Sequence, residues 1–363
     1  MSDARPLADG HAILVAGGGR WARTILKVLD SIVSAESTFY ILTRKNSEGM
    51  RRWVTDSMNF REAKVLTELP TRTNEKISGA VVVNAAADHF ETAEQLIRAG
   101  AKVLVEKPLA MDADSVRKLE TLSAECGGLL AAASVFRFTP YLPRFAGKCL
   151  SGSRIDSVSI VWEDSKSEFR YGDYKSYDAS IPVFVDVLPH VFSILASFVT
   201  VENVEFQTLD IHAGGSVVEL YFCVGVVKVH TTLSRNSRNR RRIVNVIRQD
   251  NSALEIDFSV EPGVIRMGNT EFTACDDWHV QPKPLENMLA TFIDWINHGA
   301  WDHRLSTSLA YEASALMDLI MPQYDAALST WLSRRMSGPS FMSRREREGL
   351  TYALTEMSQR FSR

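Results

Sequence analysis

Residues 12–22 read Ala-Ile-Leu-Val-Ala-Gly-Gly-Gly-Arg-Trp-Ala, and this stretch decides how the chain begins to fold. The apolar run Ile13–Ala16 predicts a buried strand, and the glycines after it predict a tight turn into a helix. Gly17 permits the bend, Gly19 lets the backbone approach a phosphate, and Ala22 allows close packing of the helix on the strand. A strand, glycine turn and helix in this order are typical of sites that bind the pyrophosphate of a dinucleotide.

Short apolar runs alternate with helical patterns through the rest of the first third of the chain. Strands are expected at 39–42, 65–66, 81–83, 103–105 and 129–133, and helices at 21–34, 47–58 and 89–98. This alternation predicts a Rossmann-type α/β domain with a doubly wound parallel sheet over residues 1–130. Because ligands of such sheets lie beyond the carboxyl ends of the strands, the segments that follow the strands should meet at one edge. These segments are 17–21, 43–45, 84–88 and 106–108.

The pattern changes after residue 130. Strands are expected at 157–162, 217–222, 226–233, 242–248 and 254–258, with few helices between them. They predict an α+β substrate and oligomerisation domain over 131–335, with a mostly antiparallel open sheet and with helices at 285–299 and 307–327. The alternating run 227–233 predicts a sheet with one buried face and one face that is accessible or covered by a partner subunit. The open face suggests a homodimer or homotetramer, an expectation that the family resemblance described below implies more than these residues do.

The last segment, residues 336–363, is expected to be a C-terminal helical extension. Ser343-Arg-Arg-Glu346 has the pattern of a capping box, in which a serine and a glutamate satisfy the first amides of a helix. An apolar stripe follows at Leu350, Leu354, Met357 and Phe361. The two features together predict a terminal helix docked on the rest of the protein.

Composition limits the class of partner. The chain has 363 residues, 45% of them hydrophobic and 23% charged, and a net charge of -3, which does not favour binding to nucleic acid or to an acidic membrane. No apolar stretch is long enough to span a bilayer, and the four dispersed cysteines fit a reducing cytoplasm. We expect no metal site, because His279 with Asp276 and Asp277, and His298 with His303, lack the spacing of metal ligands. A small-molecule substrate is the expected partner.

Three motifs together resemble the Gfo/Idh/MocA family of NAD(P)-dependent oxidoreductases. The first is Glu106-Lys107-Pro108 after an apolar strand, with His89 opening the helix before that strand. The second is Val183-Phe-Val-Asp-Val-Leu-Pro-His190, which is similar to the family's Asp-x-Gly-x-His stretch, and the third is Arg137-Phe-Thr-Pro140. The chain departs from the family at Leu188-Pro189 and at Asn84-Ala85, where the family more usually has a glycine and a Thr-Pro pair. Residues beyond about 335 lie outside the resemblance.

The resemblance implies roles for the matching residues. Lys107 would bind the reacting oxygen, His190 would act as general acid or base, and Asp186 would orient substrate hydroxyls or the imidazole. Asp186 and His190 are four residues apart and would project from one helix face, provided that Pro189 falls in the first turn. The expected catalytic residues are Lys107, His190 and Asp186. The expected cofactor-binding residues are Gly17, Gly19, Arg20, Trp21, Thr43, Arg44, Lys45, Asn84, Ala85, His89, Glu106 and Lys107. The expected substrate-binding residues are Arg137, Tyr171, Tyr174, Asp186 and His190.

The end of the second strand bears on the choice of cofactor. A site for NAD(H) commonly has an acidic residue there, which accepts hydrogen bonds from the ribose hydroxyls. This chain instead has Thr43-Arg44-Lys45, a hydroxyl followed by two cations that suit a 2′-phosphate. The residues therefore favour NADP(H) over NAD(H). The alternative is that Arg44 and Lys45 are merely solvated loop charges.

The chain contains a cluster of arginines. Five arginines lie between two expected strands, at positions 235, 238, 240, 241 and 242. They are expected to form a solvated hairpin edge, with recognition of a phosphate, nucleotide or carrier-borne substrate as the alternative.

The leading functional hypothesis is an oxidoreductase acting on a C–O bond of a sugar-like or other polar small molecule. The alternatives are an imine or ketone reductase of a specialised biosynthetic pathway and a non-catalytic NADP-binding regulatory protein.

Overall fold

The computed structural model describes residues 11–34, 37–57, 63–69, 76–166, 169–170, 173–174, 177–336 and 343–361. The chain forms two compact units. The first comprises Met1–Phe138 and Pro282–Tyr311, and the second comprises Thr139–Gln281 and Glu312–Arg363. This division differs from the expected one, because residues 282–311 join the first unit and the C-terminal extension is part of the second.

The first unit contains a six-stranded parallel sheet in the order β3-β2-β1-β4-β5-β6. This is the strand order of a Rossmann fold, as the alternating pattern predicted. The strands are β1 (His11–Ala16), β2 (Thr38–Leu42), β3 (Ala63–Leu66), β4 (Lys76–Val82), β5 (Lys102–Val105) and β6 (Leu130–Ala132). The helices are α1 (Arg20–Ile32), α2 (Ser47–Ser57), α3 (His89–Arg98), α4 (Ala113–Glu125) and α7 (Pro284–His298), with short 3-10 turns at Ala86–Asp88, Val135–Phe138 and His303–Leu305.

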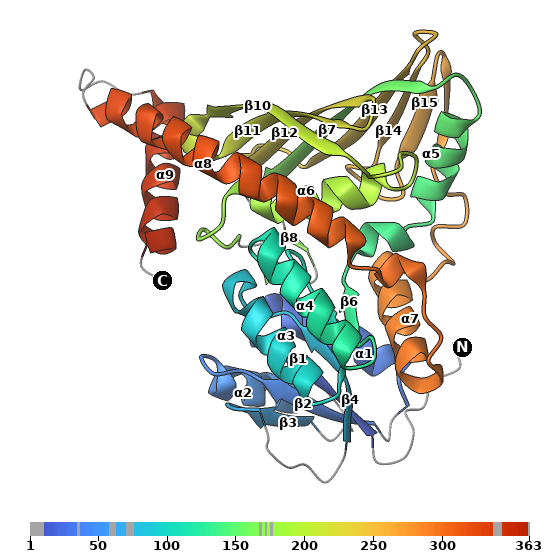
Figure 1. Cartoon of the computed structure of the whole chain (residues 1–363), viewed down its shortest axis with the longest axis vertical. Helices are drawn as coiled ribbons and strands as arrows, with labels where there is room; N and C mark the ends of the chain where they lie inside the picture. Colours follow the sequence, from blue (N-terminus) through green and yellow to red (C-terminus); the bar gives the residue numbers. More distant parts are fainter. Residues whose placement is uncertain are drawn as a thin grey trace. The chain divides into compact units, whose positions relative to one another are not determined.

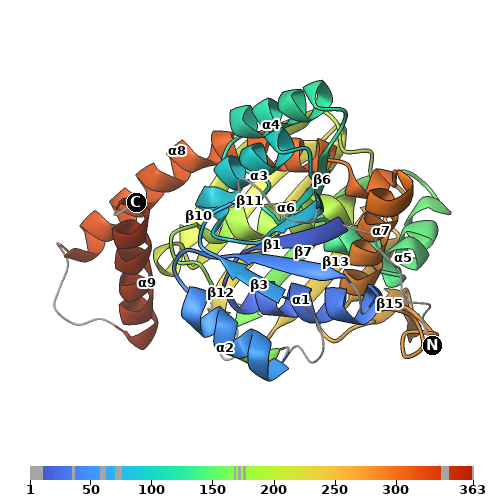
Figure 2. The same ribbon diagram turned by 90° about the horizontal axis from the view of Figure 1, so that it is seen from below.

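Helices cover both faces of this sheet. Figure 2 shows α1 and α2 on one face and α3 and α4 on the other. Alternate residues of β1 separate into two apolar clusters, since Ile13 and Val15 pack with α1 whereas Ala12 and Leu14 pack toward α3 and α4. Helix α7 joins the α1 cluster, and Gly79 of β4 makes room for it, because a Cβ there would collide with Ile296. This packing explains why residues 282–311 belong to the first unit.

The second unit contains an eight-stranded sheet in the order β10-β11-β12-β7-β13-β14-β15-β16. Only β12 and β7 run parallel, so the sheet is mostly antiparallel, as predicted. The strands are β7 (Ile155–Ser165), β10 (Val204–His212), β11 (Val217–Val224), β12 (Val227–Ser237), β13 (Arg241–Arg248), β14 (Ala253–Asp257), β15 (Val264–Met267) and β16 (Thr270–Thr273), with the short pair β8 (Phe169–Arg170) and β9 (Asp173–Tyr174). Helix α5 (Tyr141–Leu150) precedes β7, and a 3-10 turn at Ala213–Gly215 joins β10 to β11.

Helix α6 (Val183–Leu195) lies against one face of this sheet, over β11 and β12 (Figure 1). Pro189 lies in the interior of α6, so the expectation that it falls in the first turn is wrong. Pro189 has no N–H to donate to the carbonyl of Val185, yet the helix continues because its apolar residues are buried. Phe192, for example, stacks on Phe222 of β11, with ring centroids 6.1 Å apart. Tertiary packing therefore outweighs the lost hydrogen bond.

Two long helices end the chain. Helix α8 (Ser308–Met336) begins in the first unit and continues in the second, and α9 (Arg344–Phe361) follows it. The predicted capping box is confirmed, since the Ser343 amide donates to Glu346 Oε2 at 2.8 Å and the Glu346 amide donates to Ser343 Oγ at 3.3 Å. The predicted apolar stripe is wrong at Leu354, which is 49% exposed, whereas Leu350 and Met357 are half-buried and the Phe361 side chain is not described. The buried face of α9 consists of Gly349, Tyr352, Ala353 and Glu356.

None of the helices in the described part of the chain is long and apolar enough to cross a membrane.

Candidate active site

The glycine turn after β1 has the conformation that the sequence predicts. Gly17 has a φ of 155°, and a Cβ on it would lie 2.8 Å from the carbonyl oxygen of Val83. A Cβ on Gly18 would collide with Oγ1 of Thr43, whereas a Cβ on Gly19 would meet no atom of the described residues within 4 Å. The turn is therefore closely packed at its first two glycines and open above the third.

The N-terminus of α1 has the features of an anion-binding site. Its N-cap residue, Gly19, provides no capping side chain, and the first turn of the helix contains no acidic residue. The first helical hydrogen bond is donated by the amide of Arg23 to the carbonyl of Gly19, so the amides before Arg23 have no acceptor within the helix. These amides and the positive end of the helix dipole fit a pyrophosphate. The geometry of the turn thus fits the dinucleotide that the motif predicts.

Asn46 supports this turn and was not identified from the sequence. Its Nδ2 donates to the carbonyl of Gly18 at 2.7 Å, which links the segment after β2 to the glycine turn. The backbone also ties the strand ends together, since the Gly17 amide donates to Leu42 and the Val83 amide donates to Ala16. The predicted segments at the ends of β1, β2 and β4 therefore do meet at one edge of the sheet.

Two of the predicted cofactor-binding residues contact each other. Trp21 Nε1 donates to Glu106 Oε1 at 2.9 Å, and the amide of Lys107 donates to Glu106 Oε2 at 2.8 Å. Glu106 is buried, whereas Lys107 is half-buried. The carboxylate therefore joins the first turn of α1 to the end of β5, which is where the Lys107 side chain begins.

His89 contacts the backbone near the same strand end. Its ring is 2% exposed, and Nδ1 lies 2.7 Å from the carbonyl oxygen of Pro108, while Nε2 lies 3.3 Å from that of Asn84. Burial lowers the pKa of His89 below its ordinary value more than these hydrogen bonds raise it, so the ring is held neutral and its Nδ1–H donates to Pro108. Within the described residues His89 therefore links the segment at 84 to the segment at 106–108.

Asn84 presents a buried acceptor at this edge. Its Nδ2 donates to Thr92 Oγ1 at 2.8 Å, but its Oδ1 is buried and has no hydrogen-bond partner among the described residues. Such an orphaned oxygen is unfavourable unless a donor reaches it. Next to it, Ala85 is half-buried and begins the 3-10 turn Ala86–Asp88. A bound dinucleotide, which carries hydroxyl and amide donors, fits this unpartnered oxygen.

The three residues predicted to select the cofactor differ in exposure. Thr43 is buried with its hydroxyl against Gly18, and its amide donates to the carbonyl of Leu66 at 2.8 Å. Arg44 and Lys45 are exposed. Arg20, at the start of α1, is half-buried. Thr43 thus shapes the glycine turn, and two cationic side chains stand beside it.

In the second unit, His190 lies beside an aromatic residue that the sequence did not single out. The imidazole stacks on the indole of Trp162 in β7, with ring centroids 5.0 Å apart and an interplanar angle of 17°. The guanidinium carbon of Arg242 lies 3.8 Å from the centroid of the same indole. Arg242 and Trp162 are paired across neighbouring strands, so their side chains share the face of the sheet on which α6 lies.

Asp186 is paired with an arginine. Arg235 Nη2 lies 3.1 Å from Asp186 Oδ2, and the Arg235 side chain is 1% exposed. Arg242, which is also buried, pairs with Asp164 of β7. The expectation of a solvated hairpin edge is therefore wrong for these two arginines, although Arg238 and Arg241 are exposed. A cluster of arginines looks uniformly polar in sequence, and only the folded chain shows which of them face carboxylates.

The other predicted substrate-binding residues are Arg137, Tyr171 and Tyr174. Arg137 belongs to the first unit, and its Nη1 donates to the carbonyl of His303 at 2.8 Å. Burial lowers the pKa of Arg137, with Asp302 opposing this effect. Tyr171 lies outside the described residues, and Tyr174 ends the short strand β9, where its side chain is not described.

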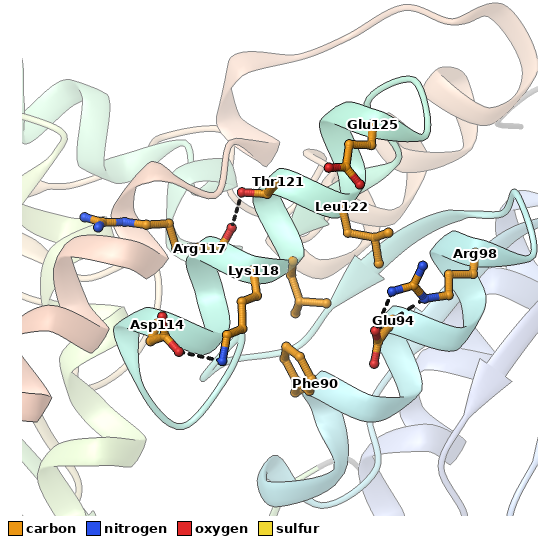
Figure 3. Close-up of a pocket in the computed structure, with 10 residues that line it drawn as sticks. Phe90, Glu94, Arg98, Asp114, Arg117, Lys118, Thr121, Leu122 and Glu125 are labelled. Carbon is orange, nitrogen blue, oxygen red and sulfur yellow. Dashed lines mark hydrogen bonds and ion pairs between the residues drawn. The ribbon is translucent and has the colours of Figure 1, made fainter.

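A pocket of about 380 Å³ lies elsewhere in the first unit, between α3 and α4 (Figure 3). Four of its charged side chains pair within a helix, Arg98 with Glu94 at 2.8 Å and Lys118 with Asp114 at 2.6 Å. None of the residues predicted from the sequence lines it. The described part of the chain contains no group of three or more His, Cys, Asp or Glu residues that could hold a metal ion.

Residues 12–133 match a family model described as an oxidoreductase family with an NAD-binding Rossmann fold. The fold and this match define the first unit as the NAD(P)-binding domain of an oxidoreductase. The model is that of the Gfo/Idh/MocA family, so over residues 12–133 the resemblance drawn from the sequence motifs is confirmed. A comparison with curated proteins found no match.

Solved structures share the two-domain architecture at low sequence identity. UDP-N-acetylglucosamine 3-dehydrogenase GnnA from Acidithiobacillus ferrooxidans has a TM-score of 0.69 and 16% identity, covering 88% of this chain and 99% of the other. KijD10, a 3-ketoreductase from Actinomadura kijaniata in complex with TDP-benzene and NADP, has a TM-score of 0.68 and 17% identity, covering 86% and 96%. The dehydrogenase MviM from Clostridium difficile has a TM-score of 0.65 and 15% identity, covering 86% and 99%. These similarities confirm the predicted fold class.

Proposed function

We propose that this protein is an NADP(H)-dependent oxidoreductase that interconverts a hydroxyl and a carbonyl group on a nucleotide-activated sugar. The observation that carries the proposal is the glycine turn and uncapped N-terminus of α1, joined through Trp21 and Glu106 to the Glu106-Lys107-Pro108 segment. The substrate class is supported by the solved structures of similar fold, which include a UDP-sugar 3-dehydrogenase and a 3-ketoreductase in complex with a TDP compound.

Each group of residues has a separate task in this proposal. The amides at the start of α1 bind the pyrophosphate, Asn84 Oδ1 accepts a hydrogen bond, and the nicotinamide, when bound, gives or takes the hydride. Lys107 hydrogen-bonds the reacting oxygen, and His190 donates or accepts the proton that accompanies hydride transfer. Asp186 accepts hydrogen bonds from substrate hydroxyls.

The preference for NADP(H) is supported by the exposed pair Arg44 and Lys45. Within the described residues no hydrogen bond or ion pair involves either side chain, so both cations are available to a 2′-phosphate. The segment after β2 also lacks the carboxylate that a ribose diol would need.

Self-association is proposed through the face of the eight-stranded sheet that points away from α6. Strands β7, β11, β12 and β13 bury alternate residues and leave the others partly exposed. On β11 and β12, for instance, the rings of Tyr221 and His230 stack with centroids 4.4 Å apart. Sedimentation velocity tests this point, and a monomer at micromolar concentration would refute it.

The experiment for the activity is a panel of UDP- and TDP-hexoses with NADP⁺ or NAD⁺, and of their keto forms with NADPH or NADH, followed by nicotinamide absorbance. Turnover is expected with NADP(H). The variant Lys107→Ala should bind NADPH but lose turnover, whereas Lys118→Ala, on the outer side of α4, should behave as wild type.

Other outcomes favour the other hypotheses. Turnover of imines or small ketones only would favour the biosynthetic reductase. Tight NADPH binding without turnover of any class would favour a regulatory protein.

A further inference from the structure

The pair formed by Arg235 and Asp186 is built asymmetrically. The arginine side chain is 1% exposed, whereas the Asp186 side chain is 20% exposed, so the cation is enclosed and the carboxylate still reaches the surface. Arg235 Nη1 donates to the carbonyl of Ile181 at 2.8 Å, just before α6 begins. One guanidinium thus binds both the backbone before α6 and the carboxylate in its first turn.

Enclosing an arginine in this way is costly unless its environment compensates. Removing a cation from water costs several kcal/mol, and an opposing charge with good hydrogen bonds must offset that cost. Burial alone would lower the pKa of Arg235, but Tyr352 and Asp186 together raise it by more. The net pKa is therefore above its ordinary value, and the guanidinium stays charged. Its Nε is buried and has no hydrogen-bond partner among the described residues.

The C-terminal helix contributes to this enclosure. The hydroxyl of Tyr352 in α9 lies 3.3 Å from Arg235 Nη1, and its ring lies 5.9 Å from the ring of Tyr177. The guanidinium carbon of Arg235 lies 4.8 Å from the centroid of the Tyr177 ring. Tyr352 therefore contacts both Arg235 and Tyr177.

Helix α9 is fastened at two further places. At Gly349 it passes the turn at Ala213–Gly215 so closely that a Cβ on Gly349 would lie 2.7 Å from the carbonyl carbon of Ala213. Glu356 accepts a hydrogen bond of 2.9 Å from the hydroxyl of Tyr324 in α8. These contacts place Tyr352 over Arg235, in a segment that lies beyond the family resemblance.

We propose that α9 is a working part of the substrate site, in which Tyr352 and Arg235 are positioning residues that orient the Asp186 carboxylate toward substrate hydroxyls. The proposal rests on the proposed function for the role of Asp186. It assigns the C-terminal extension a task beyond stability, because without Tyr352 the guanidinium loses one of its hydrogen bonds and part of its cover.

The test compares two conservative variants of the full chain. Tyr352→Phe removes the hydroxyl that contacts Arg235, whereas Tyr324→Phe removes a buried hydroxyl that also fastens α9 but does not contact Arg235. With the nucleotide sugar that wild type uses best, Tyr352→Phe should raise KM roughly three- to tenfold, as one lost hydrogen bond would. Tyr324→Phe should leave KM unchanged, and the Kd for NADPH should be unchanged in both. Equal KM effects of the two variants, or no effect of Tyr352→Phe, would overturn the proposal.

A second readout does not need a substrate. Hydrogen–deuterium exchange in peptides covering residues 178–187 should be faster in Tyr352→Phe and in Arg235→Lys than in wild type and Tyr324→Phe, because Arg235 binds Ile181 and Asp186 in this segment. Unchanged exchange in both variants would overturn the positioning role even if the enzyme were inactive on every sugar tested. Absence of wild-type turnover together with the expected exchange pattern would instead refute only the proposed function.

Discussion

The indole Nε1 of Trp21 donates a hydrogen bond to the buried carboxylate of Glu106 at 2.9 Å, which joins the first turn of α1 to the end of β5. The two residues lie 85 positions apart in the chain, and both were predicted to contact the cofactor. The structure shows that they contact each other, so a substitution at one residue should alter the environment of the other.

The variant Trp21→Phe keeps an aromatic ring but leaves Glu106 Oε1 without this donor. The loss should destabilise the protein by about 1–3 kcal/mol, as expected for a buried acceptor that loses its donor, and should weaken NADPH binding. Urea denaturation and NADPH titration measure the two effects. Trp301→Phe, at a side chain that is 49% exposed, is the control and should change neither.

Arg44→Ala tests the phosphate preference. Removing a charge-assisted hydrogen bond to a 2′-phosphate should raise the Kd for NADPH by roughly tenfold or more and leave the Kd for NADH unchanged. Arg52→Ala removes an arginine from α2 that already pairs with Glu48, so this control should alter neither affinity. Equal loss of both cofactors in Arg44→Ala would contradict a phosphate contact.

His89 should make stability depend on pH. Burial lowers its folded-state pKa below the ordinary 6.5, so in the window just below pH 6.5 the unfolded chain binds a proton that the folded chain does not. Stability from this source is complete above that pH and falls as the pH drops through the window. His89→Gln should show a shallower loss of Tm on acidification than wild type, while the exposed His298→Gln should match wild type.

Two glycine-to-alanine changes in helices should have opposite effects. Gly349→Ala places a Cβ against the backbone of Ala213 and should destabilise the protein by about 1–3 kcal/mol, with faster proteolysis of α9. Gly147→Ala in α5 meets no atom of the described residues within 4 Å and should stabilise by roughly 0.5–1 kcal/mol. If both were neutral, the close packing of α9 would be in doubt.

The stack of His190 on Trp162 gives a spectroscopic prediction. Because the imidazole lies against the indole, His190→Ala should change the fluorescence intensity of the protein at constant pH. The change should be absent when His190→Ala is made in the Trp162→Phe background. If His190→Ala left the intensity unchanged, the two rings would not be stacked in solution.

The pattern of residues predicted local structure well wherever neighbours in sequence are neighbours in space. The turn at Gly17–Gly19, the α/β alternation and the Ser343–Glu346 capping box depend on contacts within a few residues, and the structure confirms each of them. Interior Pro189 was misplaced because the burial of α6, and not its local sequence, keeps that helix continuous.

What the sequence determined by itself is the Rossmann domain, the mostly antiparallel second sheet and the family motifs, because backbone propensity and apolar periodicity act over short distances. Only the tertiary structure decided that Asp186 faces Arg235, that His190 lies on Trp162 and that Tyr352 of α9 covers the arginine. These contacts join residues from separate strands and helices. The sequence does not distinguish an arginine that faces water from one that faces a carboxylate. The burial that distinguishes the two exists only once the chain has folded.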